Sequence, residues 1–519
     1  MREPSAVFVQ AGPSDGLTAP SRAGAEVTWN DGTIEVTATR ISRVALRWSE
    51  KLPDGALILG DAWERSYGDL QWRHQQPERF LPWYFLVHDP RTGTTTGAGV
   101  DVQPNAFCSW TVDSDGFTLW LDLRNGGGPV RLDGRTLTAA VVRRFDDAGT
   151  PWQTLDAAVA SLSTRLPARP EPAPVAGPVV GANNWYYAYG ENFDEKAVLK
   201  DASTIVELAD GHPVRPFSVV DDGWYPGGVC SGGPWDRGTP GVFDDIAGTA
   251  AAIKAIGARP GIWFRPLLVR EPSPLTSTAP HDKPGRALDP TYPEVLDGLR
   301  VDLRRFKDWG FELVKHDFST YDVFGAFGPA MGSRLTRDGW QFHDPSRTTA
   351  EIVLGLYREI RSAADDLVLI GCNTVGHLAA GLVDVQRIGD DTSGRDWERT
   401  RKMGVNTLAF RLPQHNRFFT VDADCVPCTP QTPWELNARF LDLVARSGTA
   451  LFLSIDPAAR TAERDRVLRD GIRLALDGGA PEGIEPTDWL TNTTPTAWRS
   501  GSEAIEYDWS QPWGADPNG

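Results

Sequence analysis

The 519-residue sequence has few cysteines, little positive charge and no long apolar runs. Five cysteines are too few for a disulfide scaffold of this size, and an odd number leaves one over, so we expect reduced thiols. Lys and Arg total 52 against 69 Asp and Glu, a formal charge of −17 that excludes a general nucleic-acid binder, because phosphate neutralisation needs a basic surface. No apolar run approaches the roughly 18 residues that cross a bilayer, so no membrane partner is expected.

Two further absences limit the cell compartment and the cofactors. The first residues lack the apolar core of a signal peptide, which predicts a cytoplasmic protein. Cys425 and Cys428 have C-x-x-C spacing, but no second pair or histidine cluster follows, so we expect neither a metal site nor a cofactor. Tryptophan, in contrast, is abundant at 20 residues. Indole faces stack well on sugar rings, although a large β-rich core accounts for the same number.

The sequence pattern predicts a multidomain chain. Residues 1–166 hold short alternating runs broken by turn residues, which is typical of an antiparallel β-sandwich. Residues 167–178 are Pro-rich and predict a stiff linker. In residues 179–478, short β-branched or aromatic runs alternate with helical stretches about eight times, which predicts a (β/α)8 TIM barrel. Residues 479–519 are too short for a second sandwich and predict a rudimentary C-terminal β segment.

The barrel elements are predicted from the alternation of these two patterns. Strands are expected at residues 179–187, 215–220, 261–265, 313–316, 367–371, 383–388, 418–421 and 450–454. Helices are expected at residues 191–209, 243–256, 292–309, 347–364, 395–403, 433–447 and 462–476.

Carboxylates and tryptophans recur at the C-terminal ends of these strands, where barrel enzymes carry their active sites. Lys315 and Asp317 lie two residues apart on a strand and therefore face the same side. An ammonium group beside a carboxylate keeps it ionised, as an attacking nucleophile must be. An ordinary ion pair at a strand end is the alternative interpretation.

Two other strand ends carry paired aspartates. Arg387 precedes Asp390 and Asp391, and an arginine there can orient a carboxyl group that acts as an acid. Alternatively, one of these two aspartates caps the helix that follows. Asp221 and Asp222 precede Trp224, a combination that suits sugar hydroxyls and a sugar ring, with a divalent-metal site as the alternative. Two carboxylates with aromatic platforms predict glycoside hydrolysis.

The ordered motifs resemble the catalytic barrel of clan D glycoside hydrolases, and most closely the α-galactosidases of glycoside hydrolase family 36. The resemblance covers roughly residues 180–460 and extends to the β-sandwich that precedes the barrel in that family. The motifs are V-V-D-D-G-W at 219–224, G-I-W-F-R-P-L at 261–267, V-K-H-D-F at 314–318, G-C-N at 371–373, R-I-G-D-D-T at 387–392 and V-D-A-D-C at 421–425.

The resemblance implies a role for each matching residue. Asp317 is the expected nucleophile, and Lys315 contacts the sugar and keeps Asp317 ionised. Asp221 and Asp222 bind the galactose 4- and 6-hydroxyls, with Trp224 nearby.

The acid/base of the family lies four residues after the arginine, which selects Asp391 over Asp390 and makes Arg387 its orienting partner. Trp263 is expected to contact the sugar. The segment A-W-E-R-S-Y-G-D-L at 62–70 resembles part of the sandwich near the active-site mouth, so Trp63 is expected to wall the sugar pocket, with buried core as the alternative.

The implied function is a retaining exo-glycosidase that releases terminal α-linked galactose from an oligosaccharide or glycoside, with the two carboxylates about 5–5.5 Å apart. Cys372 is expected near the sugar 2-position, but Asn373 follows it where the family commonly has glycine. An α-N-acetylgalactosaminidase, a β-L-arabinopyranosidase, a transferase and an idle sugar-binding protein on the same scaffold therefore remain open. Assembly into a homo-oligomer also remains open.

Overall fold

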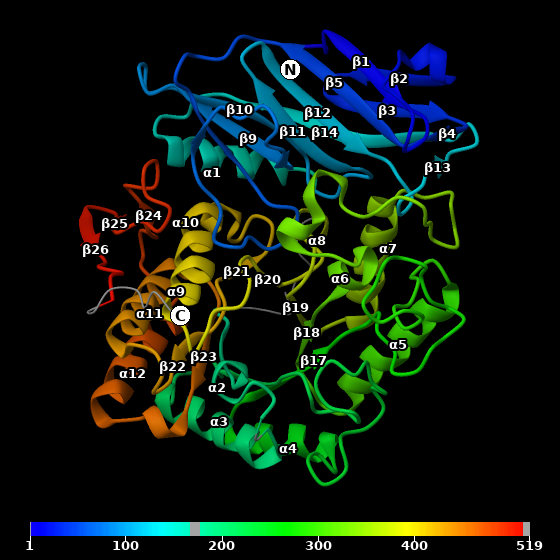
Figure 1. Cartoon of the computed structure of the whole chain (residues 1–519). Coiled ribbons are helices and arrows are strands. Elements are labelled where there is room, and N and C mark those ends of the chain that lie inside the picture. Colours follow the sequence, from blue (N-terminus) through cyan, green and yellow to red (C-terminus); the bar gives the residue numbers. More distant parts are fainter. Residues whose placement is uncertain (1, 167–176, 192, 512–519) are drawn as a thin grey trace.

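The computed structural model describes residues 2–166, 177–191 and 193–511 (Figure 1). The predicted linker at 167–178 lies outside the described residues except for its last two positions. The N-terminal strands lie above a large curved parallel sheet flanked by helices, and the last strands lie beside that sheet (Figure 1).

Two large antiparallel sheets form the N-terminal part of the chain, and we call them the N-terminal sheets. One has the order β1-β5-β12-β11-β8 and the other β2-β3-β14-β10-β9-β6-β7. Their strands are β1 (Ala6–Gln10), β2 (Ala25–Asn30), β3 (Thr33–Ala38), β5 (Arg43–Ser49), β6 (Leu57–Gly60), β7 (Arg73–His74), β8 (Leu81–Pro82), β9 (Tyr84–His88), β10 (Thr95–Val100), β11 (Phe107–Asp113), β12 (Gly116–Asp122) and β14 (Thr136–Phe145), and a separate two-stranded pair joins β4 (Arg40–Ile41) to β13 (Val130–Arg131).

Aromatic side chains join the two N-terminal sheets. The ring of Phe85 on β9 lies 5.2 Å from that of Trp110 on β11 and 5.2 Å from that of Phe117 on β12. All three side chains are buried, so the contact between the sheets excludes water and is stabilised by the hydrophobic effect.

Helix α1 (Pro151–Leu162) follows the N-terminal sheets and was not predicted from the sequence. Thr150 caps it in a capping box, because the Thr150 hydroxyl accepts from Gln153 N and the Gln153 side chain accepts from Thr150 N. Its buried face includes Leu155 and Val159, and the helix packs against β10 and β14 of the N-terminal sheets and against the 3-10 turn at residues 412–414.

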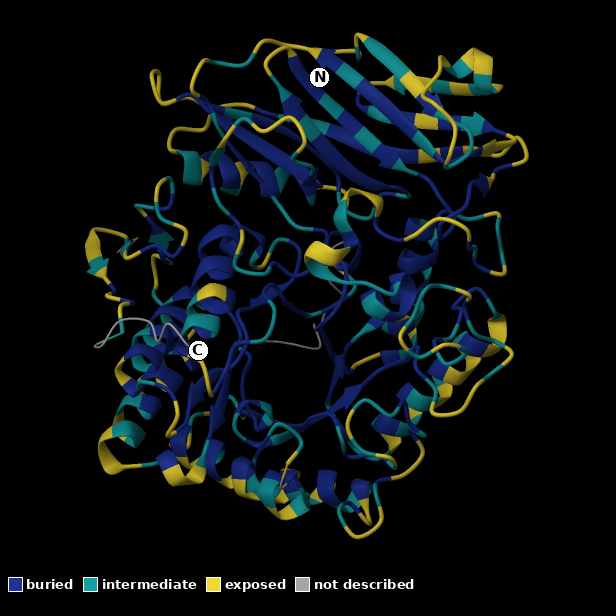
Figure 2. Cartoon of the chain, viewed as in Figure 1, coloured by how far each residue is buried: buried dark blue, intermediate teal, exposed yellow. Residues whose placement is uncertain are grey.

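The parallel sheet has nine strands in the order β21-β20-β19-β18-β17-β16-β15-β23-β22. A parallel bridge between Asp422 and Ala450 links the strand at one end of this order to the residue that precedes β23. The residues of these strands are buried, except for the partly buried Arg259 at the start of the third (Figure 2). They are β15 (Val180–Asn183), β16 (Phe217–Val220), β17 (Arg259–Phe264), β18 (Leu313–His316), β19 (Val368–Gly371), β20 (Val385–Arg387), β21 (Thr420–Asp422), β22 (Val426–Cys428) and β23 (Leu451–Ile455).

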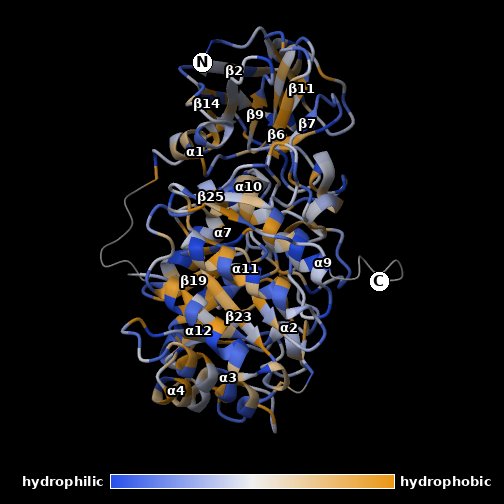
Figure 3. Cartoon of the chain, turned by 90° about the vertical axis from the view of Figure 1, so that its left-hand side faces the viewer, coloured by the Kyte–Doolittle hydropathy of each residue, from blue (hydrophilic) through white to orange (hydrophobic). Residues whose placement is uncertain are grey.

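Helices between these strands bury an apolar face on the sheet and expose the other face (Figures 2 and 3). The long helices are α3 (Glu195–Leu208), α4 (Ile246–Ile256), α5 (Pro293–Asp308), α7 (Thr349–Ala364), α11 (Trp434–Ser447) and α12 (Ala462–Leu476). Their ranges agree with the predicted helices to within four residues at either end.

Two predicted elements differ clearly from the structure, and one strand was not predicted. The strand expected at 179–187 ends at Asn183, because α2 (Trp185–Ala188) begins two residues later. The helix expected at 395–403 begins only at Trp397, where Asp396 caps α9 (Trp397–Thr400), and it continues through a π-helical turn into α10 (Thr407–Arg411). Strand β22 was not predicted.

The C-x-x-C pair lies in this unpredicted region. Cys425 and Cys428 are buried at and before β22, and all five cysteines are free thiols, as expected. Among the described residues, no group of three or more His, Cys, Asp or Glu side chains is placed to hold a metal ion. None of the helices in the described ranges combines the length and apolar character of a membrane span.

The C-terminal residues form a small antiparallel sheet of β24 (Glu485–Pro486), β25 (Ala497–Ser500) and β26 (Glu503–Glu506). Trp498 and Trp509 are buried, and the indole of Trp397 on α9 donates to the Trp509 carbonyl at 3.1 Å. This segment therefore packs on the helices of the parallel sheet.

Candidate active site

Asp317 directly follows β18, at the carboxyl end of the parallel sheet. The Trp263 indole N–H at the end of β17 donates to Asp317 Oδ2 at 3.1 Å, and the Phe318 backbone N–H donates to Oδ1 at 2.7 Å. Phe318 has a φ of 60°, a conformation that costs energy for a bulky residue and clusters at functional sites. Two donors thus fix the orientation of the carboxylate.

Lys315, two residues earlier, projects to the same edge as Asp317 and pairs with Asp221, which follows β16 on the far side of β17. Its Nζ lies 2.8 Å from Asp221 Oδ2, and the Asn183 side-chain amide donates to the same oxygen. Burial lowers the pKa of Lys315, but Asp221, Cys372 and Asp317 outweigh it and raise the pKa well above its usual value. Lys315 is therefore a permanent cation in a buried site.

Asp222 is held by its own loop. The Tyr225 hydroxyl donates to Oδ1 at 2.5 Å, and the Cys230 backbone N–H donates to Oδ2 at 3.1 Å. Burial raises the pKa of Asp222 to about 6, against the lowering effect of the Tyr225 hydrogen bond. The indole of Trp224 has no exposed surface and donates to the Trp263 carbonyl at 2.9 Å. The structure therefore places Trp224 in the core behind Trp263 and corrects its expected role of contacting substrate.

Arg387, at the end of β20, lies between two carboxylates. Its Nη2 is 3.1 Å from Asp391 Oδ1 and 2.9 Å from Asp424 Oδ2. Its Nη1 lies 3.7 Å from Cys372 Sγ. The expected pairing of Arg387 with Asp391 is present in the structure, whereas the contact with Asp424 was not predicted.

Asp391 is charged at neutral pH. Burial alone would raise its pKa, but Arg387, then Arg65 and Lys315, outweigh burial and lower the pKa of Asp391 to about 2. The side chain is 38% exposed. A carboxylate with so low a pKa can act as a base, and its pKa has to rise before it can act as an acid.

Asp390 has different partners. It pairs with Arg399 Nη2 at 2.6 Å and with Arg65 Nη2 at 3.1 Å. Neither Asp390 nor Asp391 caps the next helix, because Asp396 takes that place. This removes the capping alternative for both.

A segment of the N-terminal sheets reaches this cluster. Ser66 and Gly389 form a parallel β-bridge, in which Ser66 N donates to the Ile388 carbonyl and Asp390 N donates to the Ser66 carbonyl, both at 2.9 Å. The bridge brings Arg65 Nη1 within 3.7 Å of Asp391 Oδ1. This segment of the N-terminal sheets therefore lies beside the candidate site residues Asp390 and Asp391.

Trp63 was expected to wall the sugar pocket, but its side chain is buried elsewhere. It is 5% exposed, its ring packs 5.2 Å from that of Trp83 and 5.8 Å from that of Phe107, and its N–H donates to the Gly332 carbonyl at 2.9 Å. The structure places Trp63 in the aromatic core of the N-terminal sheets, which was the alternative interpretation.

Glu64 takes part in the site instead. Its buried carboxylate accepts from the Asn373 side-chain amide, from the Tyr67 hydroxyl at 2.6 Å and from Gly328 N at 2.9 Å. Burial raises the pKa of Glu64 in spite of Arg65 beside it. Because Asn373 Oδ1 also accepts from a backbone N–H at 3.1 Å, the Asn373 amide is held from both ends.

Cys372 connects the two halves of the site. It is 2% exposed, and burial raises the pKa of its thiol well above the usual value, with Asp317 raising it further and Arg387, Lys315 and Arg65 lowering it. The same thiol is therefore within electrostatic reach of groups from both the Asp317 half and the Asp391 half. Of the ten expected site residues, the structure gathers all but Trp63 and Trp224. Glu64, Arg65, Asn183 and Asp424 are the residues that the sequence prediction missed.

Comparison with known structures places this fold among the glycoside hydrolases. The chain has the fold of an α-galactosidase, TtGalA, from Thermus thermophilus in complex with p-nitrophenyl α-D-galactopyranoside, with a TM-score of 0.61, 18% identity and coverage of 93% of this chain and 95% of the other. A family 36 α-galactosidase, AgaA, from Geobacillus stearothermophilus in complex with 1-deoxygalactonojirimycin has a TM-score of 0.57 and 15% identity. The match covers 93% of this chain and 72% of the other. The galactosidase domain of the α-galactosidase-sucrose kinase AgaSK has a TM-score of 0.55 and 14% identity, and the match covers 88% of this chain and 67% of the other.

These likenesses confirm, at the level of fold, the resemblance to family 36 α-galactosidases that the motifs indicated. No protein-family model matches the chain. No curated protein matches its sequence.

Proposed function

We propose that the chain is a retaining exo-glycosidase that releases terminal α-linked galactose from an oligosaccharide or glycoside. The observation that carries this proposal is that the buried Lys315 interacts electrostatically with both candidate carboxylates. Asp317 raises the pKa of Lys315, and Lys315 lowers the pKa of Asp391, so all three charges belong to one site. A pair of carboxyl groups in one site is what double displacement needs.

In the first step Asp317 attacks the anomeric carbon. The Trp263 and Phe318 N–H groups leave the carboxylate with one fixed orientation, which favours attack along a single direction. Asp391 gives a proton to the departing oxygen in the same step, and as a base it later activates the water that releases the sugar.

The charged state of Asp391 matches its role in the second step. For the first step, substrate binding has to raise the pKa of Asp391. A sugar that displaces water from beside Asp391 works in this direction, because loss of water disfavours the charged form.

The remaining groups bind the sugar in this proposal. Asp221 and Asp222 accept hydrogen bonds from the sugar hydroxyls, and Lys315 donates a hydrogen bond.

In the same proposal, the parallel sheet is a (β/α)8 barrel closed at the Asp422–Ala450 bridge, and the N-terminal sheets are a β-sandwich. The domain boundaries are those proposed from the sequence, at residues 166, 178 and 478. The reaction uses no cofactor.

The direct test is hydrolysis of p-nitrophenyl α-galactoside with and without EDTA, with Asp317→Asn as the inactive control. We expect turnover that resists EDTA and an α-anomer as the first product by proton NMR. Loss of activity on chelation, release of the β-anomer, or no turnover at all would each contradict the proposal. Parallel assays with α-N-acetylgalactosaminide and β-L-arabinopyranoside identify the sugar.

A further inference from the structure

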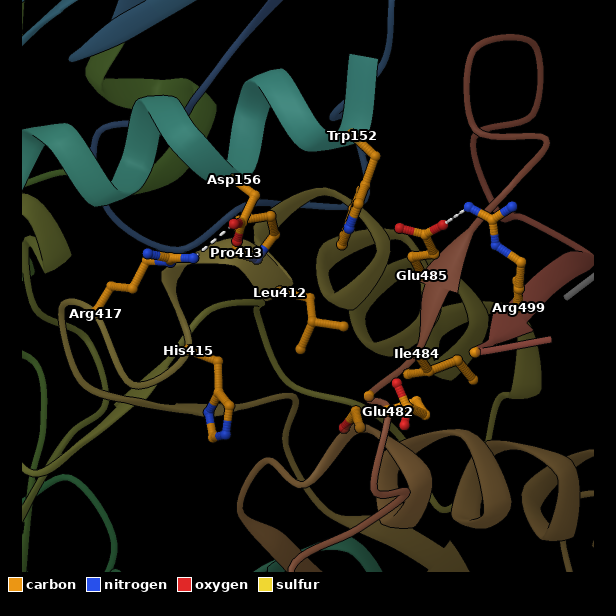
Figure 4. Close-up of a pocket in the computed structure, with 13 residues that line it drawn as sticks. Trp152, Asp156, Leu412, Pro413, His415, Arg417, Glu482, Ile484, Glu485 and Arg499 are labelled. Atoms are coloured by element: carbon orange, nitrogen blue, oxygen red, sulfur yellow. Dashed lines mark hydrogen bonds and ion pairs between the residues drawn. The ribbon is translucent and has the colours of Figure 1, made fainter. Parts of the chain in front are cut away.

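A second cavity lies away from the candidate active site, where three distant parts of the chain meet (Figure 4). It encloses about 420 Å³, which falls in the range of pockets that hold small ligands. Helix α1 forms one wall, residues 412–417 form the second, and residues 482–501 of the C-terminal segment form the third. Residues 412–417 lead into the amino end of β21, whereas the candidate catalytic residues follow the carboxyl ends of their strands, so the two sites lie at opposite edges of the sheet.

The aromatic surface of this cavity is the indole of Trp152. Figure 4 shows this side chain extending from α1 toward the space between Leu412 and Glu485. The Trp152 ring is half-buried and packs edge-on against Trp489, with ring centres 5.4 Å apart and planes at 84°. Because Trp489 is itself buried, the indole is held in place before any ligand arrives.

The two arginines that line the cavity are already paired with carboxylates. Arg417 Nη2 donates to Asp156 Oδ2 at 2.6 Å, and Arg499 pairs with Glu485 across β24 and β25. Two arginines therefore face three carboxylates, Glu482 being the third, and neither guanidinium lacks a partner. A phosphate or another anion finds no unpaired cation here, while paired charges still offer hydrogen bonds to hydroxyl groups.

We propose that this cavity binds a neutral oligosaccharide, with one sugar ring on Trp152 and its hydroxyls on the two ion pairs. An indole face with flanking hydrogen-bonding groups is the combination that a ring with one apolar face and many hydroxyls requires. The site holds a polymeric or branched substrate on the enzyme while another part of it enters the active site. The proposal depends on the proposed function only for the choice of galactosides as probes.

The test is native electrophoresis through gels that contain galactomannan, with Asp317→Asn protein so that the polymer stays intact. We expect galactomannan to retard the protein, also with 1-deoxygalactonojirimycin present to fill the active site. Trp152→Ala should weaken binding on the order of tenfold, with Trp152→Phe in between. Trp29→Ala, a half-buried tryptophan outside the cavity, is the matched control and should bind as before.

Three results would overturn the proposal: equal retardation of Trp152→Ala and its parent, no retardation by galactomannan, or retardation only by anionic polygalacturonate. If Trp152→Ala lowers the unfolding temperature, Arg499→Ala replaces it, because that arginine side chain is 50% exposed and should tolerate removal. Arg499→Ala should weaken binding several-fold, and unchanged binding would count against the site. Binding that depends on Trp152 in a protein without galactosidase activity would contradict only the proposed function.

Discussion

Replacing Arg65 with glutamine should raise the pKa of Asp391 and move the alkaline limit of activity to higher pH. Arg65 stabilises the charged form of Asp391, so its loss favours the protonated form that the first step needs. Arg65 also contacts Asp390, but Arg399 remains 2.6 Å from that carboxylate and continues to balance its charge. Loss of Arg65 should raise the pKa of Glu64 as well, because the two side chains lie 3.8 Å apart, so the comparison in an Asp391→Asn background isolates the effect on Asp391.

The size of the effect follows from the 3.7 Å that separate Arg65 Nη1 and Asp391 Oδ1. Coulomb's law at this separation gives about 1 kcal/mol at a dielectric constant of about 80 and about 4 kcal/mol at about 20. The Asp391 side chain is 38% exposed, so solvent screening favours the lower end of this range. At 1.36 kcal/mol per unit, we expect a rise of about one pKa unit.

The assay is kcat for raffinose between pH 3 and pH 9 at saturating substrate. Its leaving group needs a proton, so the fall at high pH reports the loss of that proton from Asp391 in the enzyme–substrate complex. A raised pKa keeps the acid protonated to higher pH, and the limb should move upward by about one unit.

Two controls isolate the cause. Arg47→Gln removes an arginine that pairs with Asp113 in the N-terminal sheets, 2.6 Å apart, and should leave the profile unchanged. In an Asp391→Asn background, Arg65→Gln should have no effect on the limb. A limb that stays in place or moves to lower pH in the single variant would refute the assignment of Arg65 and Asp391.

Three further outcomes follow from the same site. Asp317→Asn should lower kcat by about 10⁴-fold or more while leaving the denaturant midpoint unchanged, and appreciable residual turnover would exclude it as the nucleophile. Asp391→Asn should retain far more activity toward p-nitrophenyl α-galactoside than toward raffinose, and a stronger effect of Asp390→Asn on raffinose would reverse the choice between the two. Lys315→Met should lower the free energy of unfolding by about 3–5 kcal/mol, because it leaves the buried Asp221 carboxylate without its cation, and urea unfolding measures this.

The parts of the site that the sequence predicted lie at strand ends. Lys315 and Asp317 share a side because a strand repeats every two residues, and neighbouring parallel strands bring Asp221 to the same edge. The motifs then indicate a role for each residue at these strand ends. This explains why β18 was predicted with its observed bounds, and why Lys315 and Asp317 were expected at the same edge of the sheet.

The parts that were missed depend on contacts between distant segments. Glu64 and Arg65 stand in the same motif as Trp63, but only the β-bridge from Ser66 to Gly389 shows which side chains face the parallel sheet. A large aromatic residue favoured the choice of Trp63, and the same apolar surface explains why the structure buries it in the core. The charged residues that follow it, Glu64 and Arg65, reach the polar site instead.

The predicted boundary at residues 167–178 separates two sequence patterns but not two independent functional units. The N-terminal sheets contribute Arg65, which lowers the pKa of Asp391, and Glu64, which holds the Asn373 amide. Without these sheets the strand-end loop at 388–391 loses its β-bridge, and Asp391 loses one of its two nearest cations. The charge on the proposed acid/base is therefore set jointly by both parts of the chain, which makes the arrangement of the N-terminal sheets on the parallel sheet a part of the proposed catalytic machinery.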